Sequence, residues 1–122
     1  MDDRDAAVRL ATSRARAATG RLPATEELAA RTALSPDEVA DSIERLAAAR
    51  HLVFDEAHRI VLAHPFATRS FGFSVMGGRT LWWGGCAWDA FAIPHLVPGE
   101  PHALVATTCP ACGTAHSWVI TR

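Results

Sequence analysis

Lysine and tyrosine are absent from the sequence, and cysteine occurs only three times. All twelve basic residues are therefore arginines, and with thirteen acidic residues the formal net charge is −1. This balance provides no strong basic field, which argues against a nucleic-acid partner. An odd number of cysteines argues against a framework of disulfide bonds and suits reduced thiols or metal ligands.

Long apolar runs are also missing. Hydrophobic residues make up 49% of the chain, yet no segment reaches the roughly 18 consecutive apolar residues that a membrane-spanning helix needs. The stretch Met1–Asp5 is acidic and no apolar segment follows it, which is unlike a secretory signal peptide. We therefore expect a cytoplasmic globular protein without a membrane partner.

Charge divides the chain near His64 and Pro65. Residues 1–63, the N-terminal part, hold eleven of the thirteen acidic residues and nine of the twelve arginines. Residues 64–122, the C-terminal part, hold all four tryptophans and all three cysteines. We expect solvated helices in the N-terminal part and a compact, mostly buried unit in the C-terminal part, where any chemistry would lie.

The N-terminal part shows the signals of a winged helix-turn-helix in their usual order. An Ala- and Arg-rich helix is predicted over residues 5–18, followed by a second helix with Thr25 as its N-cap and a third with Ser35 as its N-cap. Two apolar runs at 52–54 and 60–62 are separated by a polar turn and predict a β-hairpin.

A winged helix invites a DNA-binding interpretation, in which the second helix of the motif lies in the major groove. Here the first half of that helix carries four carboxylates that would repel phosphates: Asp37, Glu38, Asp41 and Glu44. We therefore favour a winged helix that serves as a scaffold, and a DNA-binding regulator is the least favoured function.

The C-terminal part is predicted to be a small antiparallel β-rich unit with one short helix. The helix is expected over residues 86–93, with Pro94 ending it. Alternating or apolar segments predict four strands, at residues 70–75, 80–83, 103–107 and 117–121. The expected fold class is therefore α+β, with the helical N-terminal part packed on this β-rich part.

The most informative motif places Cys86 and Asp89 three residues apart after two glycines. Residues i and i+3 share one face of a helix, so the thiol and the carboxyl would point into the same volume. A helix beginning there would favour the thiolate, and apolar neighbours would favour the protonated carboxyl. The alternative is a buried structural cysteine with an aspartate that caps the helix or forms an ion pair. The aromatic residues expected to line this pocket are Trp82, Trp83, Trp88 and Phe91.

A second group of soft ligands follows, in which Cys109, Cys112 and His116 have the spacing Cys-x2-Cys-x3-His. Such a turn often supplies half of a structural zinc site, which Cys86 and one of His95, His102 or His116 could complete. A redox-active pair, or soft-metal thiols that act together with Cys86, remain open alternatives. Three histidines are interpreted as surface or packing residues: His51, His58 and His64.

The stretch from His64 to Pro94 resembles the core of the organomercurial (alkylmercury) lyases. It has a Pro-Phe start, a strand that ends in a glycine turn, and a Cys-Ala-x-Asp block at residues 86–89 that is followed by an apolar-Pro pair. The turn at residues 107–113 fits the next cysteine-containing turn of that family, and the resemblance covers roughly residues 20–122.

The resemblance implies that Cys86 is a catalytic cysteine, that Asp89 is the catalytic aspartate, and that Cys109 is structural. It implies that thiolates hold the mercury while the aspartate protonates the leaving carbon, and that no organic cofactor is required. The second catalytic cysteine of the family would lie downstream of Arg122. A second thiolate would then come from Cys109 or Cys112, or from a homodimer partner, or the chain lacks the reaction.

The sequence therefore predicts a lyase-like protein that cleaves a carbon–metal bond by thiolate capture and protonolysis. The alternative is a non-catalytic protein that binds or senses mercury, copper or zinc. Either protein would take a soft-metal or organometallic ligand, and a structural zinc at Cys109 and Cys112 is the one resident metal considered. The expected metal ligands are Cys86, Cys109, Cys112 and His116.

Overall fold

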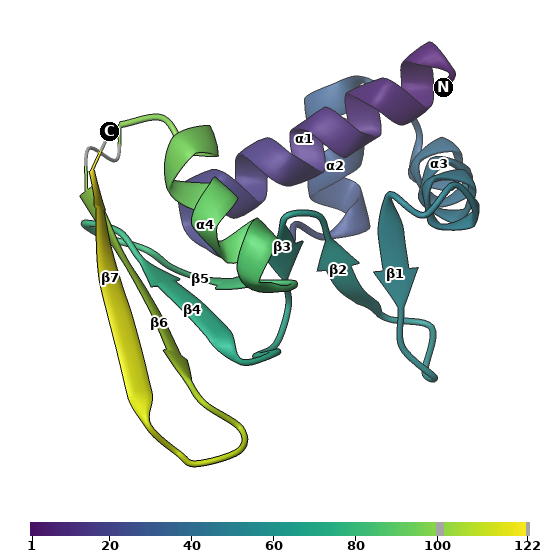
Figure 1. The fold of residues 1–122 in the computed structure, drawn as a ribbon. Coiled ribbons are helices and arrows are strands. Elements are labelled where there is room, and N and C mark those ends of the chain that lie inside the picture. Colours follow the sequence, from purple (N-terminus) through teal and green to yellow (C-terminus); the bar gives the residue numbers. More distant parts are fainter. Residues whose placement is uncertain (100–101, 122) are drawn as a thin grey trace. The chain divides into compact units, whose positions relative to one another are not determined.

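A computed structural model describes residues 1–99 and 102–121 (Figure 1). The chain divides into two compact units, Met1–Ala63 and His64–Arg122, which we call the N-terminal and C-terminal units. The described residues form four helices and seven antiparallel strands, so the predicted α+β class is confirmed. None of the helices in these residues is long and apolar enough to cross a bilayer.

The N-terminal unit consists of three helices followed by a β-hairpin, as the sequence predicts. Its elements are α1 (Asp3–Thr19), α2 (Thr25–Thr32), α3 (Pro36–Ala48), β1 (Leu52–Phe54) and β2 (Ile60–Ala63). The strands β1 and β2 pair antiparallel. The core of the unit is built from apolar residues of all these elements, and its most buried members are Val8, Leu28, Val39, Leu46, Leu52 and Ala63.

The two predicted helix caps have different outcomes. Ser35 caps α3 as predicted: its hydroxyl accepts the Glu38 N–H, and the Glu38 carboxylate accepts the Ser35 N–H, each at 3.1 Å. The prediction of Thr25 as a cap was wrong, because Ala24 is the N-cap residue of α2. The Glu27 carboxylate accepts the Ala24 N–H at 3.4 Å, so the start of α2 is capped from inside the helix.

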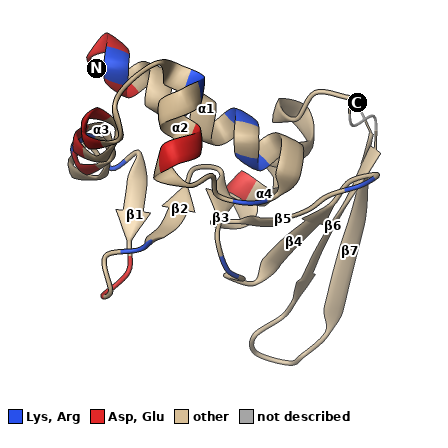
Figure 2. Cartoon of the chain, turned by 180° about the vertical axis from the view of Figure 1, so that it is seen from behind, with Lys and Arg blue, Asp and Glu red and all other residues tan. Residues whose placement is uncertain are grey.

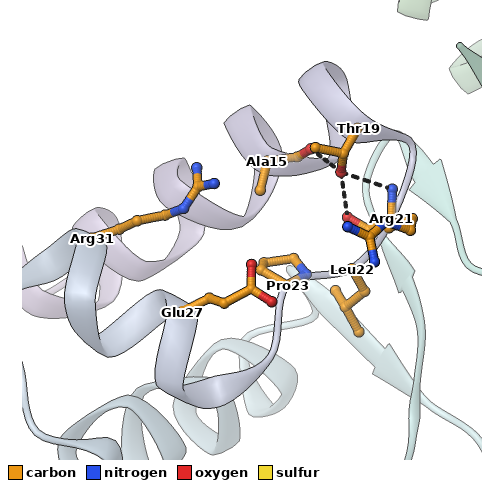
Figure 3. A pocket seen from close by; sticks show the side chains of 7 residues that line it. All are labelled: Ala15, Thr19, Arg21, Leu22, Pro23, Glu27 and Arg31. Atoms are coloured by element: carbon orange, nitrogen blue, oxygen red, sulfur yellow. Dashed lines mark hydrogen bonds between the residues drawn. The ribbon is translucent and has the colours of Figure 1, made fainter.

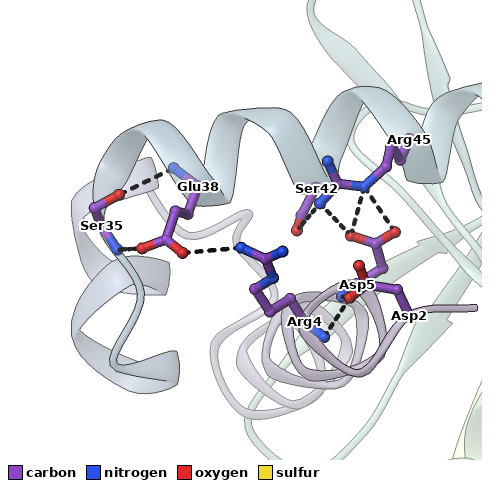
Figure 4. A network of polar contacts seen from close by, with 7 residues as sticks. All are labelled: Asp2, Arg4, Asp5, Ser35, Glu38, Ser42 and Arg45. Atoms are coloured by element: carbon purple, nitrogen blue, oxygen red, sulfur yellow. Dashed lines mark hydrogen bonds and ion pairs between the residues drawn. The ribbon is translucent and has the colours of Figure 1, made fainter.

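Two ion pairs join α1 to α3 (Figure 4). Asp5 is 6% exposed, and Arg45 donates to both of its carboxylate oxygens over distances of 2.9–3.1 Å. Arg45 also donates to the Ser42 hydroxyl at 3.1 Å. Hydrogen bonds with Arg45 and Ser42 lower the pKa of Asp5. In the first turns of the two helices, Arg4 of α1 donates to the Glu38 carboxylate of α3 at 3.1 Å. One acidic side chain of α3 is therefore paired within the N-terminal unit.

A small cavity lies beside the connection of α1 and α2 (Figure 3). The Thr19 hydroxyl closes this connection, because it donates to the Ala15 carbonyl at 2.8 Å and accepts the Arg21 N–H at 3.1 Å. The cavity volume is about 20 Å³, which holds roughly one water molecule and no organic substrate. It is lined by Ala15, Thr19, Arg21, Leu22, Pro23, Glu27 and Arg31.

The C-terminal unit is an antiparallel sheet with one helix. Its strands lie in the order β3-β5-β4-β6-β7. The elements are β3 (Phe66–Ala67), β4 (Phe73–Met76), β5 (Leu81–Gly84), α4 (Ala87–Leu96), β6 (His102–Thr108) and β7 (Ala115–Thr121). The sequence did not predict β3, because two residues are too short to show the alternation of a strand.

The helix α4 packs on one face of this sheet. Phe91 of α4 contacts Trp118 of β7 edge to face, with ring centroids 5.3 Å apart. Trp118 pairs with Val105, Val105 with Val75, and Val75 with Trp82, so these four residues share the face that α4 covers. Burial agrees, because Val75 and Val105 are 0% exposed and Trp82 is 2% exposed.

The opposite face of the sheet carries a row of exposed apolar side chains. Strand register places Leu81 opposite Met76, Met76 opposite Leu104, and Leu104 opposite Val119. Their exposed fractions lie between 38% and 70%. The two faces of the sheet therefore differ in burial, and the start of α4 lies over the buried face.

The prediction that Pro94 ends the helix was wrong. The helix α4 continues to Leu96, and the Val97 N–H still donates to the Ile93 carbonyl at 3.1 Å. Proline removes one backbone hydrogen bond here, but it lies in the last turn. Ile93 and Pro94 are both buried, and burial of these residues offsets the lost hydrogen bond.

Replacing Asp5 with asparagine should lower the melting temperature at pH 7, because Arg45 loses its charged partner. The folded pKa of Asp5 lies below the unfolded value, so the stabilisation is complete above the unfolded pKa of about 3.9 and is lost as the pH falls through the folded pKa. Circular dichroism melts of wild type and variant should therefore approach one another as the pH falls below about 4, and should converge below the folded pKa of Asp5. Asp3→Asn, an exposed change on the same helix, is the control; equal melting temperatures for wild type and Asp5→Asn at pH 7 would contradict this role.

Candidate functional site

The first turn of α4 carries both residues of the Cys-x-x-Asp motif. Cys86 is the N-cap residue, with an extended backbone, and Asp89 is the third residue of the helix. Side chains at these two positions lie close enough to interact in the capping boxes of other helices. The Cys86 thiol is free and exposed, and its side chain makes no capping hydrogen bond. The thiol is therefore accessible to a ligand from solvent.

Backbone contacts of residues 84 and 85 hold the start of α4 against the sheet. A Cβ atom on Gly84 would lie 2.8 Å from the backbone nitrogen and Cα of Ala90, so only glycine permits this contact. The Ala90 N–H in turn donates to the Cys86 carbonyl at 2.9 Å. The Gly85 N–H donates to the Pro65 carbonyl at 3.2 Å, which ties the turn to the segment before β3. The strand-to-helix turn is thus fixed at both of its ends.

The carboxyl of Asp89 is largely shielded and is held by a histidine. Its side chain is 15% exposed, and its Oδ2 lies 3.1 Å from Nδ1 of His64. Among the described residues of the C-terminal unit, Asp89 is the one acidic residue (Figure 2, red segment on α4). An imidazole in this position orients the carboxyl and can exchange a proton with it.

The interpretation of His64 as a surface or packing residue misses this contact. His64 is 25 residues from Asp89 in sequence, and its side chain is 43% exposed. The available signal was its place at the start of the lyase-like stretch, directly before Pro65. Sequence position alone does not predict the contact. It follows once β3 is known to pair with β5, because β5 is directly followed by α4.

The predicted aromatic pocket is not formed by the described residues. Trp82 and Trp83 are consecutive in β5 and so point to opposite faces of the sheet. Trp88 is 83% exposed, and Phe91 packs against Trp118. The prediction failed because a cluster in sequence was read as a cluster in space. Of the four predicted aromatic residues, Trp88 is the one that is largely exposed, and it lies in the first turn of α4.

The Cys-x-x-Cys segment forms the tight turn between β6 and β7. The Cys109 N–H donates to the Thr114 carbonyl, and the Gly113 N–H donates to the Cys109 carbonyl, each at 2.8 Å. Gly113 has a φ of 74°, a left-handed conformation that favours glycine. The Cys112 sulfur lies 3.1 Å from the Thr114 hydroxyl. Hydrogen bonds from Thr114, and then from the Cys109 thiol, lower the pKa of Cys112.

The predicted ligand set of Cys86, Cys109, Cys112 and His116 is not assembled. Within residues 1–99 and 102–121, no three or more Cys, His, Asp or Glu side chains lie close enough to share a metal ion. The His116 ring instead stacks beside Trp118, with centroids 6.0 Å apart. Structural zinc takes four protein ligands, so these residues do not fit the zinc site that the sequence suggested.

Comparison with known proteins gives a likeness in fold. No protein-family model matches the chain, and no curated protein matches its sequence. A solved structure, the mercury-bound form of MerB2, matches 98% of this chain with a TM-score of 0.71 and 13% sequence identity. The match covers 56% of the MerB2 chain, so this chain spans little more than half of that length. At this identity the likeness shows a shared fold.

Gly84→Ala should destabilise the protein by about 1–3 kcal/mol, because the new Cβ overlaps the backbone of Ala90. Urea unfolding would measure the change, with the exposed substitution Thr108→Ala as the control. Adding Ala90→Gly removes only a side-chain atom, so it should not restore stability. Wild-type stability in Gly84→Ala would show that α4 does not depend on this contact.

Thr114→Val should raise the pKa of Cys112, because it removes the hydroxyl that stabilises the thiolate. Alkylation of Cys112 by iodoacetamide, followed by mass spectrometry in a Cys86→Ser background, should then reach half of its maximal rate at a higher pH. Thr108→Val supplies a matched control outside the turn. Identical pH midpoints for the two valine variants would rule out this role of the Thr114 hydroxyl.

Proposed function

We propose that this chain cleaves carbon–mercury bonds in the manner of an organomercurial lyase. The observation that carries the proposal is the first turn of α4, where an accessible thiol and a shielded carboxyl belong to one helix start. Support also comes from the fold shared with a mercury-bound protein. The mercury compound is the substrate, and the chain's own residues supply the nucleophile and the acid.

The first step is capture of the metal by Cys86. The thiol loses its proton to solvent, and the thiolate displaces a ligand X from R–Hg–X. A sulfur–mercury bond forms, the mercury–X bond breaks, and X leaves with its electron pair. Mercury stays divalent, so no oxidant or reductant is needed. Exposure of Cys86 favours this step, because its sulfur can be reached from solvent.

The second step is protonolysis by Asp89. The protonated carboxyl delivers its proton to the carbon bound to mercury, and the electron pair of the carbon–mercury bond forms the new carbon–hydrogen bond. The hydrocarbon leaves, and Hg(II) remains on Cys86. His64 lies 3.1 Å from the carboxylate and can return a proton to it. Shielding of the carboxyl to 15% exposure limits competition from water.

A second thiolate strengthens this chemistry, because electron density donated to mercury weakens the bond to carbon. The exposure of Cys86 leaves mercury on its sulfur open to a small thiol from solution. With this source, the second thiolate does not have to come from the described residues, and the fold does not have to change. We therefore expect turnover to depend on added thiol.

The same exposed thiol also suits a second candidate function, in which the protein captures mercury without cleaving the carbon bond. Capture requires Cys86 alone, whereas cleavage also requires the acid. Substitution of Asp89 therefore distinguishes the two functions, because it should abolish cleavage and leave capture intact.

The test is incubation with phenylmercury and a small thiol, with benzene release followed by gas chromatography. Asp89→Asn should reduce the release rate at least about 100-fold, because it removes the general acid. Mass spectrometry of the same variant should still find phenylmercury on Cys86. The exposed change Asp41→Asn serves as the matched control. Release of benzene by Asp89→Asn at the wild-type rate would overturn the proposal, and mercury binding with no release by wild type would leave capture as the function.

His64→Asn separates orientation of the carboxyl from proton supply, since the asparagine amide can still form a hydrogen bond with the carboxyl but cannot take up and return a proton. We expect slower release together with the loss of one ionisation from the pH–rate profile. A purely structural histidine would change the rate without changing the shape of the profile.

A further inference from the structure

A second pair of thiols lies outside the start of α4, in the turn between β6 and β7. Cys109 is partly buried, Cys112 is exposed, and both are free. They are three residues apart in sequence, within one tight turn. Backbone hydrogen bonds from Cys109 to Thr114 and from Gly113 to Cys109 close the turn. The backbone that carries both thiols is therefore fixed before any ligand binds, which reduces the ordering cost of a chelate.

The surroundings of this pair favour an ion that takes two ligands. No third Cys, His, Asp or Glu of the described residues joins the pair, so a four-coordinate zinc site is not available. The segment from Thr108 to Ser117 contains no acidic or basic residue apart from His116. Two thiolates and one divalent cation form a neutral complex, which needs no counter-charge from such a segment.

We infer that the turn of Cys109 and Cys112 is a two-thiolate site for inorganic Hg(II), separate from the Cys86 and Asp89 chemistry. Hg(II) forms stable complexes with two thiolates and belongs to the soft ions that cysteine selects. Binding forms two sulfur–mercury bonds and releases two thiol protons to solvent, with no change of oxidation state. The exposed Cys112 side chain can rotate to place its sulfur across the ion from that of Cys109.

The same geometry discriminates against organomercurials. A phenylmercury cation has one open position and gains one strong sulfur bond, so a second thiol nearby adds little. Inorganic Hg(II) gains two bonds, and the second is intramolecular. The site therefore prefers the inorganic ion that carbon–mercury cleavage would produce, although binding itself does not depend on that cleavage.

The experiment uses Cys86→Ser, which leaves Cys109 and Cys112 as the two thiols of the chain. HgCl2 is titrated in the presence of a competing monothiol, with sulfur–mercury absorption giving affinity and native mass spectrometry giving stoichiometry. We expect one Hg(II) per chain and an affinity at least about 100-fold lower in Cys86→Ser/Cys112→Ser, because the second bond loses its effective concentration. Cys86→Ser/Ala111→Ser is the matched control, since it alters the turn and keeps both thiols.

Phenylmercury titrated into the same two variants should show a much smaller difference between them. The inference is overturned if Cys112→Ser leaves the Hg(II) affinity unchanged, if one Hg(II) bridges two chains, or if Zn(II) displaces Hg(II) at equal concentration. Because this readout involves no hydrocarbon, it is independent of the benzene assay. If Cys86→Ser binds no Hg(II), the two-thiolate site is overturned, whatever the benzene assay shows. If wild type releases no benzene, the proposed lyase function fails, whatever the Hg(II) titration shows.

Discussion

The start of α4 lies directly against β5 because residue 84 has no side chain. A Cβ there would meet the backbone of Ala90 at 2.8 Å, so the helix could not begin where it does. That contact determines which residues occupy the N-cap and the first turn, and thus where Cys86 and Asp89 lie. The candidate chemistry is therefore a consequence of backbone packing, and the apolar residues under α4 hold that packing in place.

From this start, each chemical property of the site has a local cause. Cys86 is accessible because it is the N-cap residue and makes no capping hydrogen bond. Asp89 is shielded because its helix packs on the sheet, and its carboxyl is oriented because the chain before β3 places His64 beside it. A nucleophile open to solvent and an acid sheltered from it are the combination that capture followed by protonolysis requires.

The sequence was informative where a pattern is local. Three features follow from residues within a few positions of one another. They are the capping box of Ser35 and Glu38, the hairpin at residues 52–62, and the placement of Cys86 and Asp89 at one helix start. It failed where tertiary structure decides. The helix α4 continues past Pro94 because the residues around it are buried. Trp82 and Trp83 lie on opposite faces of the sheet because side chains alternate along a strand. The contact of His64 with Asp89 depends on pairing between β3 and β5.

The most direct measurement is a crystal structure of Asp89→Asn soaked with phenylmercury, in which the carbon–mercury bond should survive. We expect mercury bonded to the Cys86 sulfur, with the phenyl carbon that is attached to mercury facing the side chain at position 89. A phenyl group directed away from position 89, or mercury bound only at the turn between β6 and β7, would contradict it.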